Sequence, residues 1–340
     1  MPKLYQAPMK DRFEVPAQEC DVQDKRKLES YRALWRKWMS WYDHSPDEPH
    51  SIEQQLHTML FNDLTYRSIV VARATTGPEV TVSAQASTLA YLLDTGYVTT
   101  QTLAVLKLLD NRRDVISVMR LLKDVQKNRA VITREIYVSS FGFPYEPQSW
   151  QTGGRELSPA VGVFGLEAPE LTYWLQSHYL HETFDRQSGK GPDERSREDV
   201  IPNAVFKRLH DWLDTDSIRK LEGLRNNFLA HAANSASRGE TKNQGVRFVE
   251  LDEAQRAIIR VERAITDLIL ARRIAREVMP MPPLGMFSKL DLVYATKDSE
   301  RQMYDRWDEL SKERNQWKNG VLGELVPLPT VADGDGGETL

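Results

Sequence analysis

The spacing of apolar residues constrains this 340-residue chain more than any other feature. Nearly every apolar run places its large side chains three and four residues apart, which is the spacing of one face of an α-helix. No run alternates with the period of two that a half-buried strand requires. The pattern therefore predicts an all-α fold, an elongated helical bundle with a long mid-chain loop and additional helices near both ends.

Composition excludes several classes of protein. The chain is 40% hydrophobic and 28% charged, with a formal net charge of −4, so any contact with nucleic acid must come from a local basic patch. Cys20 is the only cysteine, which excludes an intramolecular disulfide and a cysteine-based zinc site. We expect no metal and no cofactor. The first residues lack a signal-peptide core and no run reaches the roughly 20 apolar residues of a membrane span, so we expect a cytoplasmic protein with no membrane contact.

Proline, glycine and charge divide the chain into three parts. Residues 1 to 24 are polar and rich in proline and are expected to form an N-terminal arm. Residues 25 to 320 are expected to form one helical domain, and residues 321 to 340 a disordered acidic tail. The segment from 138 to 168 holds many of the glycines and prolines, which fits either a functional lid or an ordered surface connection. Residues 186 to 199 are expected to be a solvated linker.

Helix boundaries follow from capping residues and breakers. Ser51, with Gln54 three residues later, is a predicted N-cap, and Asp114 is another. Pro46 and Pro49 end the first helix. The predicted helices cover about 28–42, 51–75, 83–94, 99–109, 114–128, 169–185, 205–213, 215–232, 252–278 and 297–318.

The helix over about 215 to 232 contains two side chains that its apolar face does not explain. At 100° of rotation per residue, Arg225 falls inside the stripe formed by Leu221 and Phe228, and His231 falls at the edge of that stripe. Burying an unpaired charge costs several kcal/mol, so a helix that only fills a core would carry an aliphatic residue at the position of Arg225. This pattern favours a functional role for the two residues.

Arg225, Asn226 and His231 resemble the signature of the HEPN superfamily, an arginine usually followed by a polar residue and then a histidine about four to six residues further on. The surrounding residues 221 to 233 and the long preceding helices look most like its abortive-infection (AbiU-like) branch. The resemblance implies a helical bundle that dimerises across the motif helix. For active members it implies a metal-independent endoribonuclease, often used in phage defence or in toxin systems, where a neutralising protein partner is possible.

The side chains of the motif suit attack of a ribose 2′-hydroxyl on the adjacent phosphate. His231 can move protons near neutral pH, and the planar guanidinium of Arg225 can hold the developing phosphate charge. Asn226 or Asn227 can fix the imidazole or the phosphate. In one helix, Arg225 and His231 are separated by about 9 Å of rise and 120° of rotation. A two-fold axis that brings two copies together around one cleft solves this, which predicts a homodimer acting on single-stranded or loop RNA.

Three alternatives remain open for the motif. Arg225 can instead pair with Glu222 at the i, i+3 spacing, with His231 serving as a hydrogen-bonded residue near the helix end. The whole chain can be a catalytically silent helical dimer that acts as a protein-interaction module. A nucleotide-binding or nucleotidyltransferase-partner module would use Arg225 as its phosphate anchor.

Other candidate sites favour structural readings. His178, His181 and Glu182 match no zinc spacing closely, so a polar network is the better interpretation. The helix over 252 to 278 is rich in arginine, but its acidic residues favour a solvated, salt-bridged face over a phosphate-tracking surface. The aromatic stripe of the first helix, which includes Trp35, Trp38 and Tyr42, favours core or dimer packing over stacking on bases.

Overall fold

Helices dominate the described part of the chain, as the apolar spacing predicts. The computed structural model describes residues 13–43, 50–75, 84–146, 151–152, 155–156, 169–229, 245–272, 278–279, 282–283, 285–287 and 299–325. Strand structure among these residues is one antiparallel pair, β1 (Gln151–Thr152) and β2 (Arg155–Glu156). The all-α prediction is confirmed.

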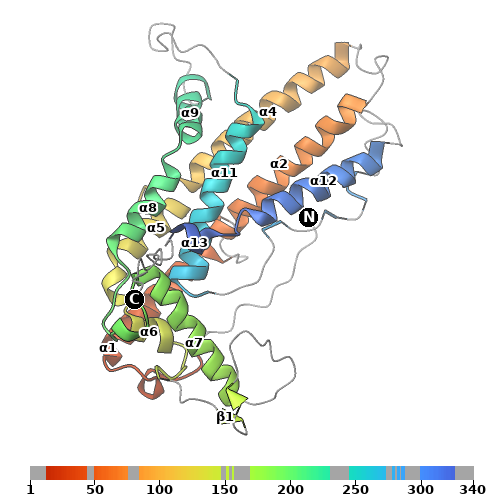
Figure 1. Cartoon of the computed structure of the whole chain (residues 1–340). Helices are drawn as coiled ribbons and strands as arrows, with labels where there is room; N and C mark the ends of the chain where they lie inside the picture. Colours follow the sequence, from red (N-terminus) through yellow and green to blue (C-terminus); the bar gives the residue numbers. More distant parts are fainter. Residues whose placement is uncertain are drawn as a thin grey trace, which may run out of the picture.

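Four long helices lie side by side at one end of an elongated molecule (Figure 1). Helix α2 packs against both α4 and α12, and α11 packs against α4. The shorter α9 lies against α4 and α11 at the same end. The bounds are α2 (Ile52–Thr75), α4 (Ala84–Leu108), α9 (Asp216–Leu224), α11 (Phe248–Arg263) and α12 (Ser299–Gln316).

The other end of the molecule is built from shorter helices around the first helix and the seventh (Figure 1). Helix α8 packs against α5 and α11, α6 against α7, and α13 against α7 and α8. The elements are η1 (Ala17–Glu19), α1 (Lys25–Tyr42), α5 (Val118–Lys127), η2 (Arg129–Val131), α6 (Arg134–Ser139), α7 (Pro169–Ser188), η3 (Pro192–Glu194), α8 (Asn203–Leu213) and α13 (Val321–Leu325).

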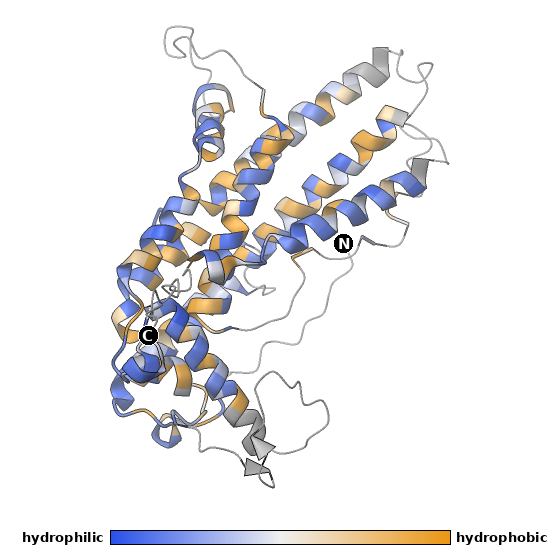
Figure 2. Ribbon diagram, in the orientation of Figure 1, coloured by the Kyte–Doolittle hydropathy of each residue, from blue (hydrophilic) through white to orange (hydrophobic). Residues whose placement is uncertain are grey.

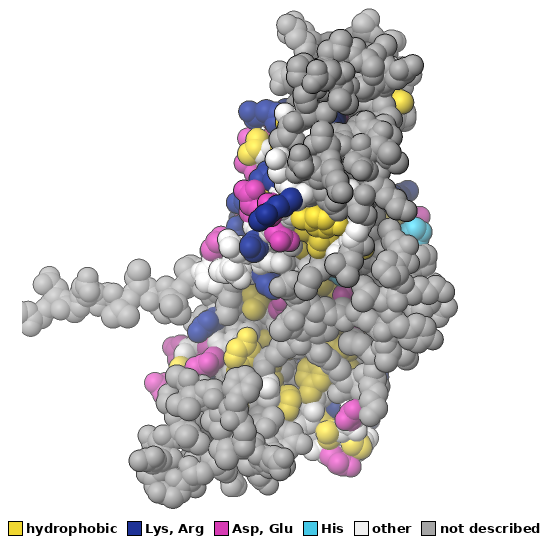
Figure 3. All heavy atoms as spheres, turned by 90° about the vertical axis from the view of Figure 1, so that its right-hand side faces the viewer, with side chains coloured by type: hydrophobic (Ala, Val, Ile, Leu, Met, Phe, Trp, Pro, Cys, Tyr) yellow, Lys and Arg dark blue, Asp and Glu magenta, His cyan; other side chains and the backbone are white. Residues whose placement is uncertain are grey.

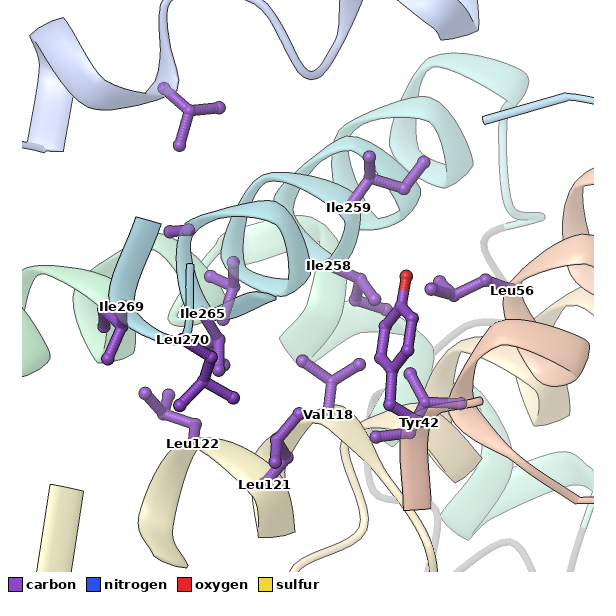
Figure 4. Packing of buried hydrophobic residues seen from close by; sticks show 14 of the residues in the cluster. Tyr42, Leu56, Val118, Leu121, Leu122, Ile258, Ile259, Ile265, Ile269 and Leu270 are labelled. Atoms are coloured by element: carbon purple, nitrogen blue, oxygen red, sulfur yellow. The ribbon is translucent and has the colours of Figure 1, made fainter. Parts of the chain in front are cut away.

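The apolar sides of the helices meet in one continuous core. Helix α5 points Leu121 and Leu122 toward Ile265 and Ile269 of the chain that follows α11, and all four are completely buried (Figure 4). Hydrophilic residues occupy the outer sides of the ribbons, most completely on α12 (Figure 2). The aromatic residues of α1 belong to this core, because Trp35, Trp38 and Tyr42 are buried. The core reading of that stripe is confirmed.

The capping residues set most helix starts as expected. Ser51 Oγ accepts a hydrogen bond from the backbone N–H of Gln54 at 3.3 Å, which confirms the predicted start of α2. The predicted cap at Asp114 is wrong. Helix α5 begins after Ser117, whose Oγ accepts from the N–H of Arg120 at 3.0 Å. Ser117 has the same capping chemistry and stands three residues nearer the apolar residues that α5 buries.

Helix α4 runs without interruption through the point where two helices were predicted, about 83–94 and 99–109. Gly96 lies between the two predicted segments, and glycine in a helix costs only about 1 kcal/mol relative to alanine. Packing of one face of α4 outweighs that cost, since Tyr97, Gln101 and Val105 are buried. The two predicted helices are therefore one.

The N-terminal segment packs into the domain from residue 13 onward, although residues 1 to 24 were expected to form an arm. The Phe13 ring lies 5.2 Å from that of Trp35 and 5.1 Å from that of Phe141. Cys20 and Val22 are also buried. The expectation missed this because a few apolar residues between prolines show no helical period.

Residues 186 to 188 belong to α7, and most of residues 189 to 200 are exposed, as the predicted solvated linker expects. The connection is nonetheless tied to the domain near its end. The backbone N–H of Arg134 donates to the carbonyl oxygen of Asp199 at 2.8 Å. The buried guanidinium of Arg134 pairs with the carboxylates of Asp199 at 2.9 Å and Asp185 at 2.5 Å. Asp199 is thus the buried exception in an otherwise solvated connection.

Two π-helical turns continue α-helices in this fold. Segment η4 (Arg225–Leu229) follows α9, and η5 (Ala264–Ile269) follows α11. Regular structure after α11 therefore ends at Ile269 rather than near 278. Side chains bond the carbonyls that follow the second turn. Trp35 Nε1 donates to Leu270 O at 3.1 Å, and Gln187 Nε2 donates to Leu268 O at 3.0 Å.

The end of the described chain is folded further than expected. Helix α12 was predicted closely, and Gly320 follows it with a φ of 72°. The next residues, placed in a disordered tail over 321 to 340, begin with the short helix α13, in which Val321 and Leu325 are buried. The remainder of that tail lies outside the described residues, as does most of the loop over 138 to 168.

Candidate functional site

The motif segment begins with a conventionally capped helix. Thr215 Oγ1 accepts a hydrogen bond from the N–H of Ile218 at 3.2 Å, which fixes the start of α9. Polar contacts then hold α9 against α11. Ser217 donates to Glu253, and three residues later Lys220 pairs with Glu250 at 2.8 Å. Because the pairing advances along α9 while it recedes along α11, the two helices run antiparallel.

Glu250 is the anchor of this attachment. Burial raises the pKa of its carboxyl, but the hydrogen bonds from Lys220 and from the backbone and side chain of Arg247 outweigh burial and lower the pKa to about 2. The carboxylate therefore stays ionised throughout the physiological range. Its position fixes the part of α9 that immediately precedes Arg225.

Arg225 is the first residue of η4 and is half-buried. Arg225 keeps the α-helical register with Leu221, because its backbone N–H bonds the carbonyl oxygen of Leu221, so the angle of 100° per residue fails only for the residues after it. The guanidinium is nonetheless half-buried rather than enclosed in the interior of the bundle. Helix α4 packs against η4 on one side.

The guanidinium of Arg225 has no carboxylate partner among the residues that the structure describes. Its Nε donates to Asn226 Oδ1 at 3.0 Å. Glu222, the partner in the structural alternative, is exposed and forms no ion pair with it in the described part of the chain. Arg219, on the same helix, shows the contrast because it pairs with both Asp214 and Asp216. Arg225 thus keeps its terminal nitrogens available to an anion.

Only part of the predicted site can be placed. Arg225 and Asn226 are brought together, with Asn226 exposed and Asn227 half-buried. His231 and the residues that follow it lie outside the described residues. The distance from Arg225 to the predicted proton-transfer group therefore stays a prediction.

The histidines of α7 have separate partners, as the polar-network reading expects. His178 Nε2 lies 3.4 Å from Glu182 Oε1, whereas the ring of His181 turns inward and its Nε2 bonds the carbonyl oxygen of Tyr145 at 2.7 Å. Burial lowers the pKa of His181 to about 4, although the bond to Tyr145 acts in the opposite direction. Among the described residues, no cluster of three or more potential metal-binding side chains occurs.

The arginines of α11 and the turn after it are packed more deeply than a solvated face would allow. Arg263 and Arg272 are buried, and Arg263 pairs with Asp267 at 3.3 Å. Arg260 stacks its guanidinium 4.4 Å from the ring centroid of Trp212. The prediction of a salt-bridged helix is correct, and Arg256 is exposed as a solvated face requires. For Arg263 and Arg272 the solvated reading is wrong, because their side chains are buried.

A buried ionic cluster between four helices escaped sequence reasoning. Asp63 and Arg314 are fully buried and pair at 2.9 Å, and Arg67 bonds both Asp63 at 3.0 Å and Asp252 at 2.6 Å. The hydroxyl of Tyr97 donates to Asp63. Asp63 and Arg67 stand four residues apart, the one local signal that the sequence offers. Balanced charges and mutual ion pairs make this cluster a packing element rather than a binding site.

Comparisons with known proteins add no assignment to this geometry. No protein-family model, no curated protein and no solved structure matches the chain. Within the described residues, every helix is too short or too polar to span a lipid bilayer.

Proposed function

We propose that this protein is a metal-independent endoribonuclease of the HEPN type, acting on single-stranded or loop RNA in phage defence or as a toxin. Arg225, Asn226 and His231 form its site, with Asn227 and Glu222 in supporting positions. The helical fold is compatible with that proposal. Two copies of the chain are needed to surround one scissile phosphate, so the active species is a homodimer.

The proposed reaction needs two kinds of group. His231 takes the proton of a ribose 2′-hydroxyl, whose oxygen attacks the adjacent phosphorus. The bond from phosphorus to the 5′-oxygen breaks, and that oxygen leaves with a proton. Arg225 stabilises the extra negative charge on the non-bridging oxygens. The products are a 2′,3′-cyclic phosphate and a 5′-hydroxyl.

The observation that carries the proposal is that the guanidinium of Arg225 has no carboxylate partner among the described residues. Other arginines of the same region, such as Arg219 and Arg247, have carboxylate partners that neutralise them. Arg225 has an amide partner instead, which orients the guanidinium without cancelling its charge. It also begins a π-helical turn, a local geometry that occurs frequently at functional sites.

Figure 3 shows why a local site is needed. On this side of the molecule, basic and acidic side chains lie next to one another rather than in separate patches. With a net charge of −4 as well, the chain lacks the broad positive field that would attract RNA from a distance. Recognition in this proposal depends on the cations at the site and on access to the 2′-hydroxyl in unpaired RNA.

The test is cleavage of a labelled unpaired RNA by the purified protein in the presence of EDTA. We expect products with 2′,3′-cyclic phosphate and 5′-hydroxyl ends, and loss of cleavage on His231→Ala. Arg219→Ala is the matched control, because it removes an exposed arginine from the same helix. Cleavage that requires a metal, or that survives His231→Ala, would contradict the proposal. An intact dimer without cleavage would favour the silent interaction module.

A further inference from the structure

The solvent side of α4 is uncharged over most of its length. At 100° per residue, Leu92, Gly96, Thr100 and Leu103 lie within about 80° of one another, and all four are exposed. Leu92 is 59% exposed and Leu103 40%. We call these four residues the α4 face. Asp94 lies on the opposite side of α4 and pairs with Arg73 at 2.7 Å. Among the described side chains, the stripe of the α4 face meets its first charge at Lys107, one turn after Leu103.

Helix α12 provides the contrast within the same bundle. Its exposed positions include Arg301, Asp305, Asp308 and Glu309, the charged side chains that a solvated helix normally presents. Both helices pack against α2 and are similar in form. The two helices therefore differ in the composition of their outer sides. The outer side of α12 is charged, as expected for contact with solvent, whereas the α4 face has the composition of a surface that packs against another protein surface.

The apolar surface continues beside the α4 face. At the start of α11, Phe248 is 40% exposed and Val249 51%. The Phe248 ring lies 5.9 Å from the ring of Tyr97, and the guanidinium of Arg67 lies 4.4 Å from its centroid. These contacts hold the ring in place while part of it remains open to solvent.

We propose that the α4 face is the contact between two copies of this chain, which cross antiparallel about a two-fold axis at Gly96. Such an axis places Leu92 of one copy against Thr100 of the other, so an apolar side chain meets a small one on both sides of the crossing. The face carries no charge, so identical copies meet without like-charge repulsion. Around Gly96 no other side chain comes within 4 Å of the Cβ position, which leaves room for close approach of the second helix.

The area that a stable dimer needs and the lack of charge on the α4 face both favour a second copy of the chain as its partner. A stable dimer buries about 800 Å² on each partner, more than one face of a helix about 37 Å long provides, so Phe248 and Val249 belong to the contact. Nucleic acid is a poor occupant because the α4 face contributes no cation. The inference deepens the proposed function by assigning the contact that a composite site needs, and it rests on that proposal for the role of the dimer. Helix α4 also packs against η4, the segment of Arg225.

The first experiment measures the mass of the full chain by light scattering at micromolar concentration. We expect about twice the 39.1 kDa of one chain. Leu92→Glu with Leu103→Glu places like charges in the contact and should weaken association at least about hundredfold. Gln302→Glu with Gln316→Glu adds the same charge to exposed positions of α12 and should leave the dimer intact. Helical circular dichroism and cooperative unfolding check that both variants fold.

The second experiment locates the axis. Thr95 is exposed beside Gly96, so Thr95→Cys should be joined to its counterpart by a short bismaleimide. Gln302→Cys should not, and the wild type, whose Cys20 is buried, gives the background. A monomeric wild type, a dimer that survives the two glutamates, or absence of the Thr95→Cys product would overturn the inference. The inference would also be overturned if Leu92→Glu with Leu103→Glu weakened RNA binding and left the mass unchanged. Mass and cross-linking do not depend on cleavage, so a dimer without activity would contradict the proposed nuclease alone, and an active dimer that survives the two glutamates would contradict the α4 contact alone.

Discussion

Arg314 of α12 and Asp63 of α2 meet in the interior of the bundle, with 2.9 Å between Nη2 and Oδ2 and with both side chains completely buried. Asp252 of α11 is shared by Arg314 and Arg67 at its edge. Burial raises the pKa of Asp252, whereas the two arginines act to lower it. The four helices are therefore joined by charges that depend on one another.

Arg314→Met should destabilise the protein by about 3 to 5 kcal/mol, because it leaves Asp63 buried without its partner on α12. Urea denaturation measures the change. Arg301→Met on the exposed side of the same helix is the control and should change the free energy of unfolding by less than about 0.5 kcal/mol. A loss below about 1 kcal/mol for Arg314→Met would show that solvent reaches Asp63.

Arg225→Lys should rescue little of the cleavage that Arg225→Ala abolishes, since an ammonium ion cannot reproduce the planar fork that binds two phosphate oxygens. His231→Ala should lower the rate by about two to four orders of magnitude, the usual contribution of general acid–base catalysis. Single-turnover cleavage of an unpaired RNA measures both. Full activity of Arg225→Lys would show that the site requires only the positive charge of Arg225 and not its planar guanidinium.

Stability should fall with acid in a way that depends on His181. Burial lowers its folded pKa to about 4 from the ordinary 6.5, so between these values the unfolded chain binds the proton more readily. The contribution is fully present above pH 6.5 and is lost as the pH falls toward 4, by about 3 kcal/mol. His181→Gln keeps a donor for Tyr145 and should flatten this part of the stability curve. Equal slopes for variant and wild type would disprove it.

Gly96→Ala should separate the stability of one chain from that of the dimer. Replacing glycine within a helix stabilises it by about 1 kcal/mol, and the position is open. The added methyl group stands at the proposed crossing, so association should weaken. Unfolding at high dilution and the concentration dependence of the mass measure the two effects. A tighter dimer would place the crossing elsewhere along α4.

Phe13→Ala should cost about 3 to 5 kcal/mol, the range for a large aromatic residue removed from a core. The same substitution in a solvated arm would change the free energy of unfolding very little, because no buried contact would be lost. Thermal or urea unfolding provides the measurement, and Glu14→Ala, at the exposed neighbouring position, is the control. If Phe13→Ala changed the free energy of unfolding no more than the control does, residues 13 to 24 would be a surface arm rather than part of the core.

The sequence predicted helices well where the apolar period was long and a cap was present. Ser51 and the aromatic residues of α1 are examples, because local hydrogen bonding and one buried face act together there. It failed at Gly96, where packing from neighbouring helices overrides a weak local preference. It also failed at Phe13 and Asp199, whose burial depends on partners distant in the chain.

In the candidate site, too, local features could be predicted from the sequence and features that depend on distant residues could not. The sequence identified Arg225 as unusual, and the structure leaves it without a carboxylate partner among the described residues. Arg225 is half-buried rather than enclosed, although a helical wheel holds up to this residue. The wheel fails for the residues after Arg225, because nothing in the local sequence indicates a π-helical turn. The pairing of Asp63 with Arg314 spans 251 positions, so no short-range pattern could reveal it.

The π-helical turn at Arg225 has a consequence for how length changes act on this protein. Such a turn accommodates one more residue than the α-helix around it, so removing a single residue from 225–229 would restore ordinary α-helical hydrogen bonding and shorten the segment without breaking it. The shortened turn would sweep nearly the same angle with one residue fewer, so the residues after the deletion would keep nearly their direction around the helix axis relative to α9. The same deletion within α9 would instead turn every later side chain of that helix by about 100°. In this segment, the helix can lose a residue without changing the direction in which the side chains beyond it face.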